Sequence, residues 1–133
     1  MGTEVMRNHF HENIWIDSLE YRMRSAEANH PCVIISDTRF TNELDLIKRL
    51  GGVVINVERG EKPEWYNTAS LANSGHVPSQ HIMNTRYKSV HLSEWNWVGY
   101  DFNHVISNND TLESLQAMVD STHELITLND TKK

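Results

Sequence analysis

Apolar residues recur at helical spacing through most of the first thirty positions of the chain. Thr3 and Asn13 are each placed to cap a helix. The sequence NHP at 29–31 ends the second helix, because the residue before a proline is pushed out of the helical region. The pattern therefore predicts two helices, whose apolar residues are Val5, Met6 and Phe10 in the first and Trp15, Leu19, Met23 and Ala26 in the second.

The pattern then changes to uninterrupted apolar runs. CVIIS at 32–36 and VVINV at 53–57 show no alternation, which predicts two strands covered on both faces, as in parallel sheets. Between them an amphipathic helix opens at Thr41 or Asn42 and stops at the glycine pair 51–52. A strand, a helix and a strand in this order predict a right-handed parallel crossover. The apolar face of the helix holds Leu44, Ile47 and Leu50.

The second half of the chain is less regular. Residues 60–100 show no sustained period, so we expect an irregular, lid-like excursion that is not a core element. FNHVISN at 102–108 predicts a third strand, and Asp110 with Glu113 forms a capping box for a last helix. The fold class expected for residues 1–133 is a single α/β domain, a small three-layer parallel sheet with flanking helices. The residues of the last helix that we expect to face inward are Leu112, Leu115, Val119, Thr122 and Ile126.

The charge and composition of the chain limit the kinds of partner that it can bind. The net charge of -6 leaves no broad positive field for a duplex, so we expect no binding to duplex nucleic acid. Cys32 is the single cysteine, so an intrachain disulfide is excluded. We expect its side chain to be a small buried hydrophobic group, as in a protein of a reducing compartment. No apolar run approaches the ~20 residues of a membrane span, and the N-terminus lacks the pattern of a signal peptide. We therefore expect a cytoplasmic protein without membrane contact.

The candidate chemistry lies in SDTRFTNE at 36–43, where the predicted strand ends. Ligands of open α/β sheets bind beyond the carboxyl ends of the strands. Asp37 could coordinate Mg²⁺, and Arg39 could hold a phosphate by two hydrogen bonds, with Asn42 and Glu43 at the same edge. The alternative is that Asp37 and Arg39 only cap the turn and pair with each other.

Further cations are candidates for phosphate binding. Arg7 lies four residues after Thr3 on one side of the predicted first helix. Arg59, Arg86 and Lys88 flank or lie within the excursion, where mobile cations could close over a phosphoryl group. The alternative for these residues is ordinary solvated surface charge.

The eight histidines do not have the spacing of a zinc site. His9 and His11 point to different faces of a helix, and neither they nor His76 and His81 belong to an HExxH frame. The 133 residues also contain no GxSxG nucleophile elbow and no HRD catalytic loop of kinases. The pair Trp95 and Trp97 is more typical of a packing anchor than of a base-stacking platform.

Four stretches of the chain together resemble the deoxynucleoside monophosphate kinases of bacteriophages. The resemblance implies a P-loop kinase fold that transfers the γ-phosphoryl group of ATP to a deoxynucleoside monophosphate with Mg²⁺. A phage-encoded protein would work in the cytosol of the host cell. The four stretches are GTEVMRNHFHENIWID at 2–17, VIISDTRFTNELDLIKRLGGVVINVER at 33–59, HLSEW at 91–95 and DFNHVISNNDTLESL at 101–115.

The resemblance also implies roles for single residues. Arg7 resembles the arginine that holds the substrate phosphate, and Asp37 and Arg39 resemble an acidic and basic pair at the active-site edge. Asp37 would hold Mg²⁺ only with a nucleotide bound. Residues similar to cations of the lid are Arg59, Arg86 and Lys88, and residues similar to the loop near the adenine of ATP are Asn108, Asn109 and Asp110.

The chain departs from this family at Asp110, where a glycine is commoner, and above all in its phosphate-binding motif. Its 133 residues contain no GxxxxGK[ST] motif, whose amides and lysine position the phosphates during transfer. Losing even one preorganised donor of an anion site costs ~10²–10³ in rate. We therefore expect no catalysis by this chain alone, and a role as a regulator or inhibitor that binds a nucleotide or a host protein.

Two alternatives remain open at this stage. The chain could be a fragment or subunit of an active kinase, with ATP and Mg²⁺ bound once another chain supplies the P-loop. It could also be a small acidic interaction domain. The resemblance also implies a central strand before the P-loop that these residues lack, so the predicted strands at 33–36 and 53–57 would face a gap. In each case we expect this exposed strand edge to be covered by re-paired strands, by a homodimer or by a protein partner.

Overall fold

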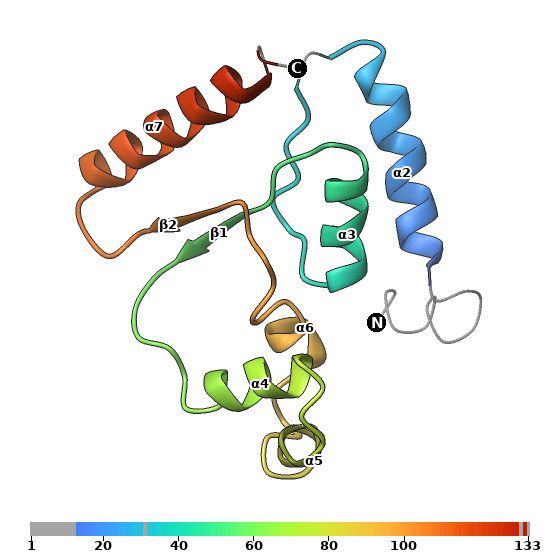
Figure 1. The fold of residues 1–133 in the computed structure, drawn as a ribbon, viewed down its shortest axis with the longest axis vertical. Coiled ribbons are helices and arrows are strands. Elements are labelled where there is room, and N and C mark those ends of the chain that lie inside the picture. Colours follow the sequence, from blue (N-terminus) through green and yellow to red (C-terminus); the bar gives the residue numbers. More distant parts are fainter. Residues whose placement is uncertain (1–12, 31, 131, 133) are drawn as a thin grey trace.

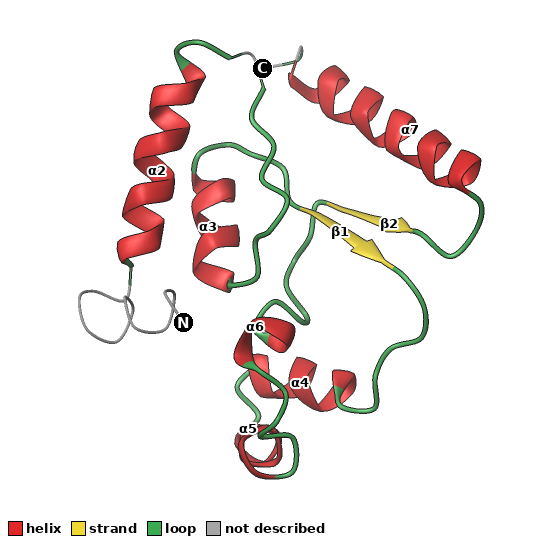
Figure 2. Ribbon diagram, turned by 180° about the vertical axis from the view of Figure 1, so that it is seen from behind, coloured by secondary structure: helices red, strands yellow, loops and turns green. Residues whose placement is uncertain are grey.

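The computed structural model describes residues 13–30, 32–130 and 132 (Figures 1 and 2). The described residues form a mixed α/β fold with six helices and a two-stranded parallel sheet. The predicted mixed α/β class is confirmed, but only two of the three predicted strands form. The elements are α2 (Ile14–Glu27), α3 (Thr41–Arg49), β1 (Ile55–Glu58), α4 (Tyr66–Asn73), α5 (Val77–Thr85), α6 (Leu92–Trp95), β2 (His104–Ser107) and α7 (Leu112–Asp130).

The sheet pairs β1 with β2 in parallel, with Ile55 opposite His104 and Val57 opposite Ile106. The predicted strand at 102–108 is confirmed as β2. The strand predicted at 53–57 forms as β1, but it is not covered on both faces, since the side chain of Val57 is 59% exposed. The reason is that α7 packs along β2 and buries Ile106, while no helix among the described residues packs on β1 (Figure 1).

The strand predicted at 33–36 is wrong, and so is the crossover that depended on it. These residues have no regular secondary structure, and Ile34 is 87% exposed. Cys32 is exposed as well, contrary to its predicted burial. A β-branched run becomes a strand only when a neighbouring strand pairs with it, and none of the described residues does so here. The parallel connection of this fold instead runs from β1 to β2.

Helix α3 ends as its glycine pair predicts. Gly51 has a φ of +80° and its N–H donates to the carbonyl of Lys48, while the N–H of Gly52 donates to the carbonyl of Ile47 at 2.8 Å. These two bonds form a Schellman motif, which needs a left-handed residue. The helix buries Leu44 as predicted and also Leu46, which the predicted face did not include.

Helix α2 confirms the second predicted helix and packs against α3. Asn13 occupies the N-cap position, and the helix ends at Glu27, before the NHP sequence. Its most buried residue is Ile16, whereas the predicted inward residue Trp15 is 37% exposed. Glu20 joins the two helices through an ion pair with Arg49 at 3.0 Å. The first predicted helix, with its cap Thr3, lies outside the described residues.

The prediction that residues 60–100 form an irregular excursion outside the core is wrong. This stretch folds into α4, α5 and α6, which form a helical unit below the sheet in Figure 1. The helices have 8, 9 and 4 residues, so none is long enough to show a sustained period. A buried cluster consists of Ala69, Ala72, Met83 and Val98, packed against Trp65, Tyr66, Tyr87, Trp95 and Trp97. The interpretation of the tryptophan pair as a packing anchor is confirmed.

Helix α7 confirms the last predicted helix, although its cap is different. The hydroxyl of Thr111 accepts the N–H of Ser114 at 3.1 Å, so Thr111 takes the place predicted for Asp110. Leu115, Thr122 and Ile126 are half-buried, as expected, but Leu112 and Val119 are exposed and α7 has no fully buried residue. Among the described residues, no helix has the length and apolar character needed to cross a membrane.

Candidate functional site

The candidate site begins at the turn that leads into α3. Phe40 has an extended backbone and occupies the N-cap position of this helix. The carboxylate of Glu43 reaches back over the turn and accepts the N–H groups of Arg39 at 3.0 Å and Phe40 at 3.1 Å. A carboxylate in the first turn also offsets the positive end of the helix dipole. Glu43, which the sequence placed at the candidate phosphate-binding edge, therefore holds the backbone of the site.

A second contact fixes this turn from a distant part of the sequence. The side-chain oxygen of Asn96, directly after α6, accepts the N–H of Thr41 at 2.8 Å and the hydroxyl of Thr41 at 3.2 Å. The two residues are 55 positions apart. The N-terminus of α3 is thus held against the α6 segment, which contains Glu94.

Arg39 faces the same segment. Its guanidinium lies 3.8 Å from the carboxylate of Glu94, and both side chains are 59% exposed. Exposed pairs of this kind contribute little stability, on the order of 0–1 kcal/mol, so an incoming anion can replace the glutamate at low cost. The predicted alternative, a pair between Arg39 and Asp37, is not present among the interactions of the described residues.

Asp37 is exposed, and its carboxylate makes no hydrogen bond or ion pair with the described part of the chain. A Mg²⁺ ion in a nucleotide site typically takes one or two carboxylates and completes its shell with water and phosphate oxygens. The donor chemistry of Asp37 fits such an ion. No cluster of three or more possible metal-ligating side chains occurs among the described residues, so the nucleotide would have to contribute ligands.

The predicted base loop lies at the carboxyl end of the sheet. The carbonyl of Glu58 accepts the N–H of Asn108 at 2.7 Å, and the side chain of Asn109 accepts the N–H of Gly60 at 2.6 Å. Asp110 accepts the N–H of Thr111 at 2.9 Å. These bonds tie the loop after β2 to the loop after β1, which places Asn109 close to the exposed residue Arg59.

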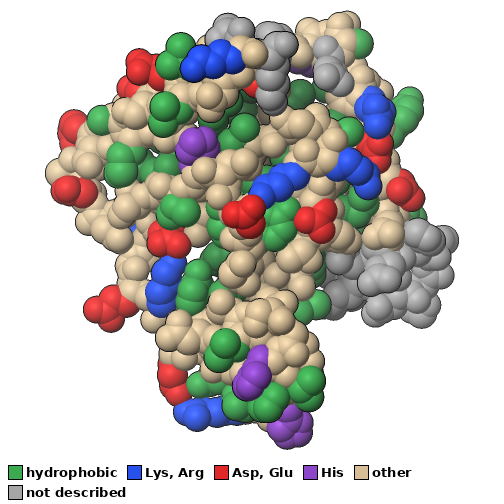
Figure 3. Space-filling model, in the orientation of Figure 1, with side chains coloured by type: hydrophobic (Ala, Val, Ile, Leu, Met, Phe, Trp, Pro, Cys, Tyr) green, Lys and Arg blue, Asp and Glu red, His purple; other side chains and the backbone are tan. Residues whose placement is uncertain are grey.

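Two other predicted cations lie in the helical unit. The guanidinium of Arg86 pairs with Glu64 and stacks over the ring of Tyr87 at 5.2 Å, and Lys88 is exposed. On the face shown in Figure 3, basic and acidic side chains are interspersed and no continuous positive area is present. Arg86 is therefore engaged within its own unit.

Lys62 is a cation that the sequence analysis missed. It pairs with Glu58 at 2.6 Å and lies over the ring of Tyr66 at 4.5 Å. The hydrogen bond to Glu58 raises the pKa of this lysine. The sequence could have indicated this pair, because Lys62 lies four residues after Glu58. Outside a helix, however, this spacing does not bring two side chains together by itself.

The predicted residues therefore form separate groups. Arg39 and Glu43 share the turn before α3, and Arg59 and the loop at 108–110 share the end of the sheet. Arg7 lies outside the described residues. Asn96 and Glu94 were missed, and no local signal identifies them because their partners are far away in the sequence.

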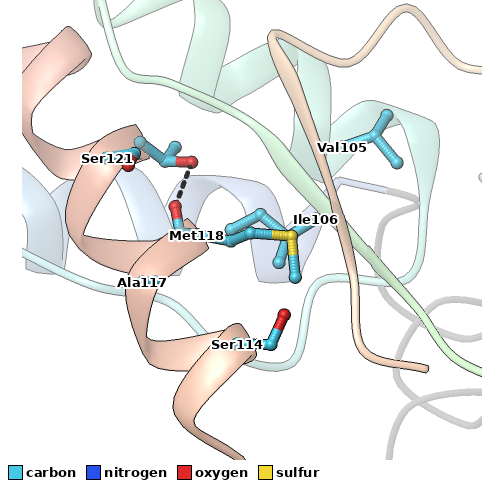
Figure 4. A pocket seen from close by; sticks show the side chains of 7 residues that line it. Val105, Ile106, Ser114, Ala117, Met118 and Ser121 are labelled. Atoms are coloured by element: carbon cyan, nitrogen blue, oxygen red, sulfur yellow. Dashed lines mark hydrogen bonds between the residues drawn. The ribbon is translucent and has the colours of Figure 1, made fainter. Parts of the chain in front are cut away.

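A shallow groove of about 330 Å³ lies between β2 and α7 (Figure 4). Small and apolar side chains form it, and none of the predicted site residues lines it. The hydroxyl of Thr122 donates back to the carbonyl of Met118 at 2.8 Å. This arrangement offers no charged group to a phosphate. The lining residues are Val105, Ile106, Ser114, Ala117, Met118, Ser121 and Thr122.

Comparison with known proteins matches a part of the chain that includes the turn before α3. The sequence profile of the family described as deoxynucleotide monophosphate kinase matches residues 1–70. A protein of Acanthamoeba polyphaga mimivirus, assigned by name to the deoxynucleotide monophosphate kinases, is 40% identical over 68 residues. That match covers 44% of this chain and 35% of the viral relative. No solved structure matches this chain. Since the family profile covers more than half of the sequence, this chain belongs to the deoxynucleotide monophosphate kinase family.

Proposed function

We propose that this chain binds a deoxynucleoside monophosphate at the turn before α3 and that the 133-residue polypeptide does not transfer phosphoryl groups by itself. The observation that carries the proposal is the exposed guanidinium of Arg39. Its backbone is fixed by Glu43, and among the described residues its charge is balanced by a weak pair with Glu94. The family profile supports it, because its match at 1–70 includes this turn.

The contacts around Arg39 suit a phosphate ligand. A phosphate oxygen pair can accept two parallel N–H bonds from a guanidinium, which are stronger than a single pair at 3.8 Å. Glu43 and Asn96 hold the backbone of residues 39–41, so less freedom is lost when the ligand binds. Asp37 would hold a Mg²⁺ ion, which neutralises phosphate charge when bound.

Transfer of a phosphoryl group needs more than this turn. The triphosphate must be positioned by a cradle of amides and a lysine, and the 133 residues contain no GxxxxGK[ST] motif that would form one. A polypeptide that holds the monophosphate without organising ATP acts by binding. It would sequester the nucleotide, or present the nucleotide-bound form to a protein partner as a regulator or inhibitor.

The unmatched length of the viral relative favours a second function. Only 35% of that protein is matched, so its remaining length holds parts that this sequence does not align with. The unpaired run at 33–36 and the open side of β1 are compatible with a missing strand between them. In this version the chain is part of an active kinase whose P-loop lies on another polypeptide.

Thermal-shift titration with each of the four deoxynucleoside monophosphates tests the binding proposal. A ligand at a hundred times its Kd stabilises the folded state by about 2.7 kcal/mol, so the matching nucleotide should raise the Tm. Arg39→Ala should abolish the shift. Arg49→Ala is the matched control, because its side chain is 64% exposed and also pairs with a glutamate. Equal shifts in both variants, or no shift with any nucleotide, would contradict the proposal.

The transfer step is tested separately by following diphosphate formation with ATP and Mg²⁺. The polypeptide alone should give no turnover above the rate without protein. Turnover by the polypeptide alone would overturn the binding-only proposal. Turnover that starts only after a P-loop polypeptide is added would establish the second function.

A further inference from the structure

Glu94 places a negative charge beside the guanidinium that the proposed function uses. The two groups lie 3.8 Å apart, which is within reach of an ion pair but too far for a hydrogen bond. Among the described residues, the guanidinium of Arg39 donates no hydrogen bond, and its backbone N–H donates to Glu43. Glu94 therefore acts on Arg39 through its charge and leaves the N–H donors of the guanidinium available to a ligand.

The backbone that carries Glu94 is held on two sides. In Figure 1 its helix, α6, lies between α4 and α3. The amide of Asn73 on α4 donates to the carbonyls of Trp95 and Asn96, at 2.8 and 3.3 Å. The side chain of Asn96 in turn accepts the N–H of Thr41 on α3. Because the segment is anchored to both helices, the carboxylate stays close to the turn before α3 when a ligand arrives, and only side-chain rotation can move it.

The other carboxylate at this turn, that of Glu43, is balanced in a different way. It accepts two backbone N–H groups and lies at the positive end of α3, so its charge is offset whether or not a ligand is present. The carboxylate of Glu94 is balanced, among the described residues, by Arg39. A phosphate that takes the guanidinium therefore leaves the charge of Glu94 without its partner and close to the charge of the ligand.

We propose that Glu94 is a selectivity residue of the nucleotide site, an inference that rests on the proposed function. Its charge lowers the affinity of Arg39 for every phosphate group by the same factor, about three- to tenfold for exposed charges at this distance. Inorganic phosphate, which has no group besides its oxygens to offer, then binds too weakly to occupy the site. A nucleotide compensates through its base and sugar, so a repulsive element in the site selects the larger ligand.

Glu94→Gln tests the proposal, because it keeps the shape of the side chain and removes its charge. In calorimetric titrations at low salt, this variant should bind inorganic phosphate and the deoxynucleoside monophosphate preferred by the unaltered chain about three- to tenfold more tightly. Glu64→Gln is the matched control. Its carboxylate is 71% exposed and pairs with Arg86 in the helical unit, so its loss should leave both Kd values unchanged. Both variants should fold, since exposed pairs contribute little stability.

Salt dependence distinguishes a charge effect from a structural one. The gain of Glu94→Gln should shrink between about 10 mM and about 1 M NaCl, where the screening length falls to about 3 Å. The inference alone fails if Arg39→Ala abolishes nucleotide binding but Glu94→Gln binds no more tightly, keeps its gain at high salt, or gains no more than Glu64→Gln. Binding by Glu94→Gln when the unaltered chain shows none would support the inference. If neither binds a nucleotide, the proposed function fails with it.

Discussion

At the scale of single residues, Tyr100 shows how a side chain joins two parts of the molecule. Its hydroxyl donates to the carboxylate of Asp45 on α3 at 2.8 Å, and the ammonium of Lys48 lies 5.1 Å from the centre of its ring. The ammonium of Lys48 also donates to the backbone carbonyl and to the carboxylate of Asp101. Burial, and then the bond to Asp45, raise the pKa of Tyr100 to about 12. The phenol is therefore held in its neutral, donating form.

This shift predicts a loss of stability in alkaline solution. The folded-state pKa is above the unfolded value, so the stability that Tyr100 contributes is fully present below pH ~10 and is lost as the pH rises toward 12. Urea unfolding at a series of pH values should show this decline, and Tyr100→Phe should make it smaller. Tyr87 contributes in the same direction, because burial also raises its pKa, so some decline will remain. Tyr21→Phe, at a 75% exposed position, should leave the decline unchanged.

At the scale of elements, local signals placed the helices better than the strands. Helices α2, α3 and α7 form where spacing and caps predicted them, because a helix satisfies its backbone groups within its own segment. The run at 33–36 has a stronger strand composition than FNHVISN at 102–108, yet only the latter forms a strand. A strand depends on its neighbour, and the described fold offers a strand partner to residues 104–107 but not to residues 33–36.

Gly51 provides a test of how α3 is terminated. With a φ of +80°, this residue is in a conformation that costs an L-residue with a Cβ atom about 1–2 kcal/mol. Gly51→Ala should lower the free energy of unfolding by about that amount, as measured by urea denaturation. Gly51→Asn should cost less, since asparagine tolerates the left-handed region. Space is not the cause, because a Cβ atom at this position would meet no atom within 4 Å. Equal losses from both variants would contradict the conformational explanation.

At the scale of the whole molecule, a buried core cluster lies where the sequence showed least periodicity. The cluster around Met83 and Val98 belongs to the helical unit at 60–100, and Asn73 links this unit together. The amide of Asn73 donates to the carbonyls of Trp95 and Val98, both at 2.8 Å. Asn96, Tyr100 and Lys48 then connect the unit to α3. The segment predicted to be a lid is thus a packed support for the turn that carries Arg39.

Met83 tests the importance of this core. Its side chain is 2% exposed, and replacing such a methionine by alanine typically costs about 2–5 kcal/mol. Met83→Ala should lower the urea midpoint of the tryptophan fluorescence transition, because Trp65, Trp95 and Trp97 pack against the cluster. Ile82→Ala, one residue earlier and 38% exposed, should cost about 1 kcal/mol or less. Similar losses from the two variants would show that residues 60–100 are not organised around this core.

Sequence alone determined the family, the mixed α/β class, the three longer helices and the parallel strand β2, because each depends on local spacing, capping residues or matched motifs. Tertiary structure decided the rest. It left residues 33–36 without a strand partner, buried a core within short helices that carry no long period, and paired Arg39 with Glu94. It also fixed the site turn through Thr41 and Asn96, which are 55 positions apart. Contacts between such distant residues leave no local pattern, since the intervening chain can be folded in many ways that separate them.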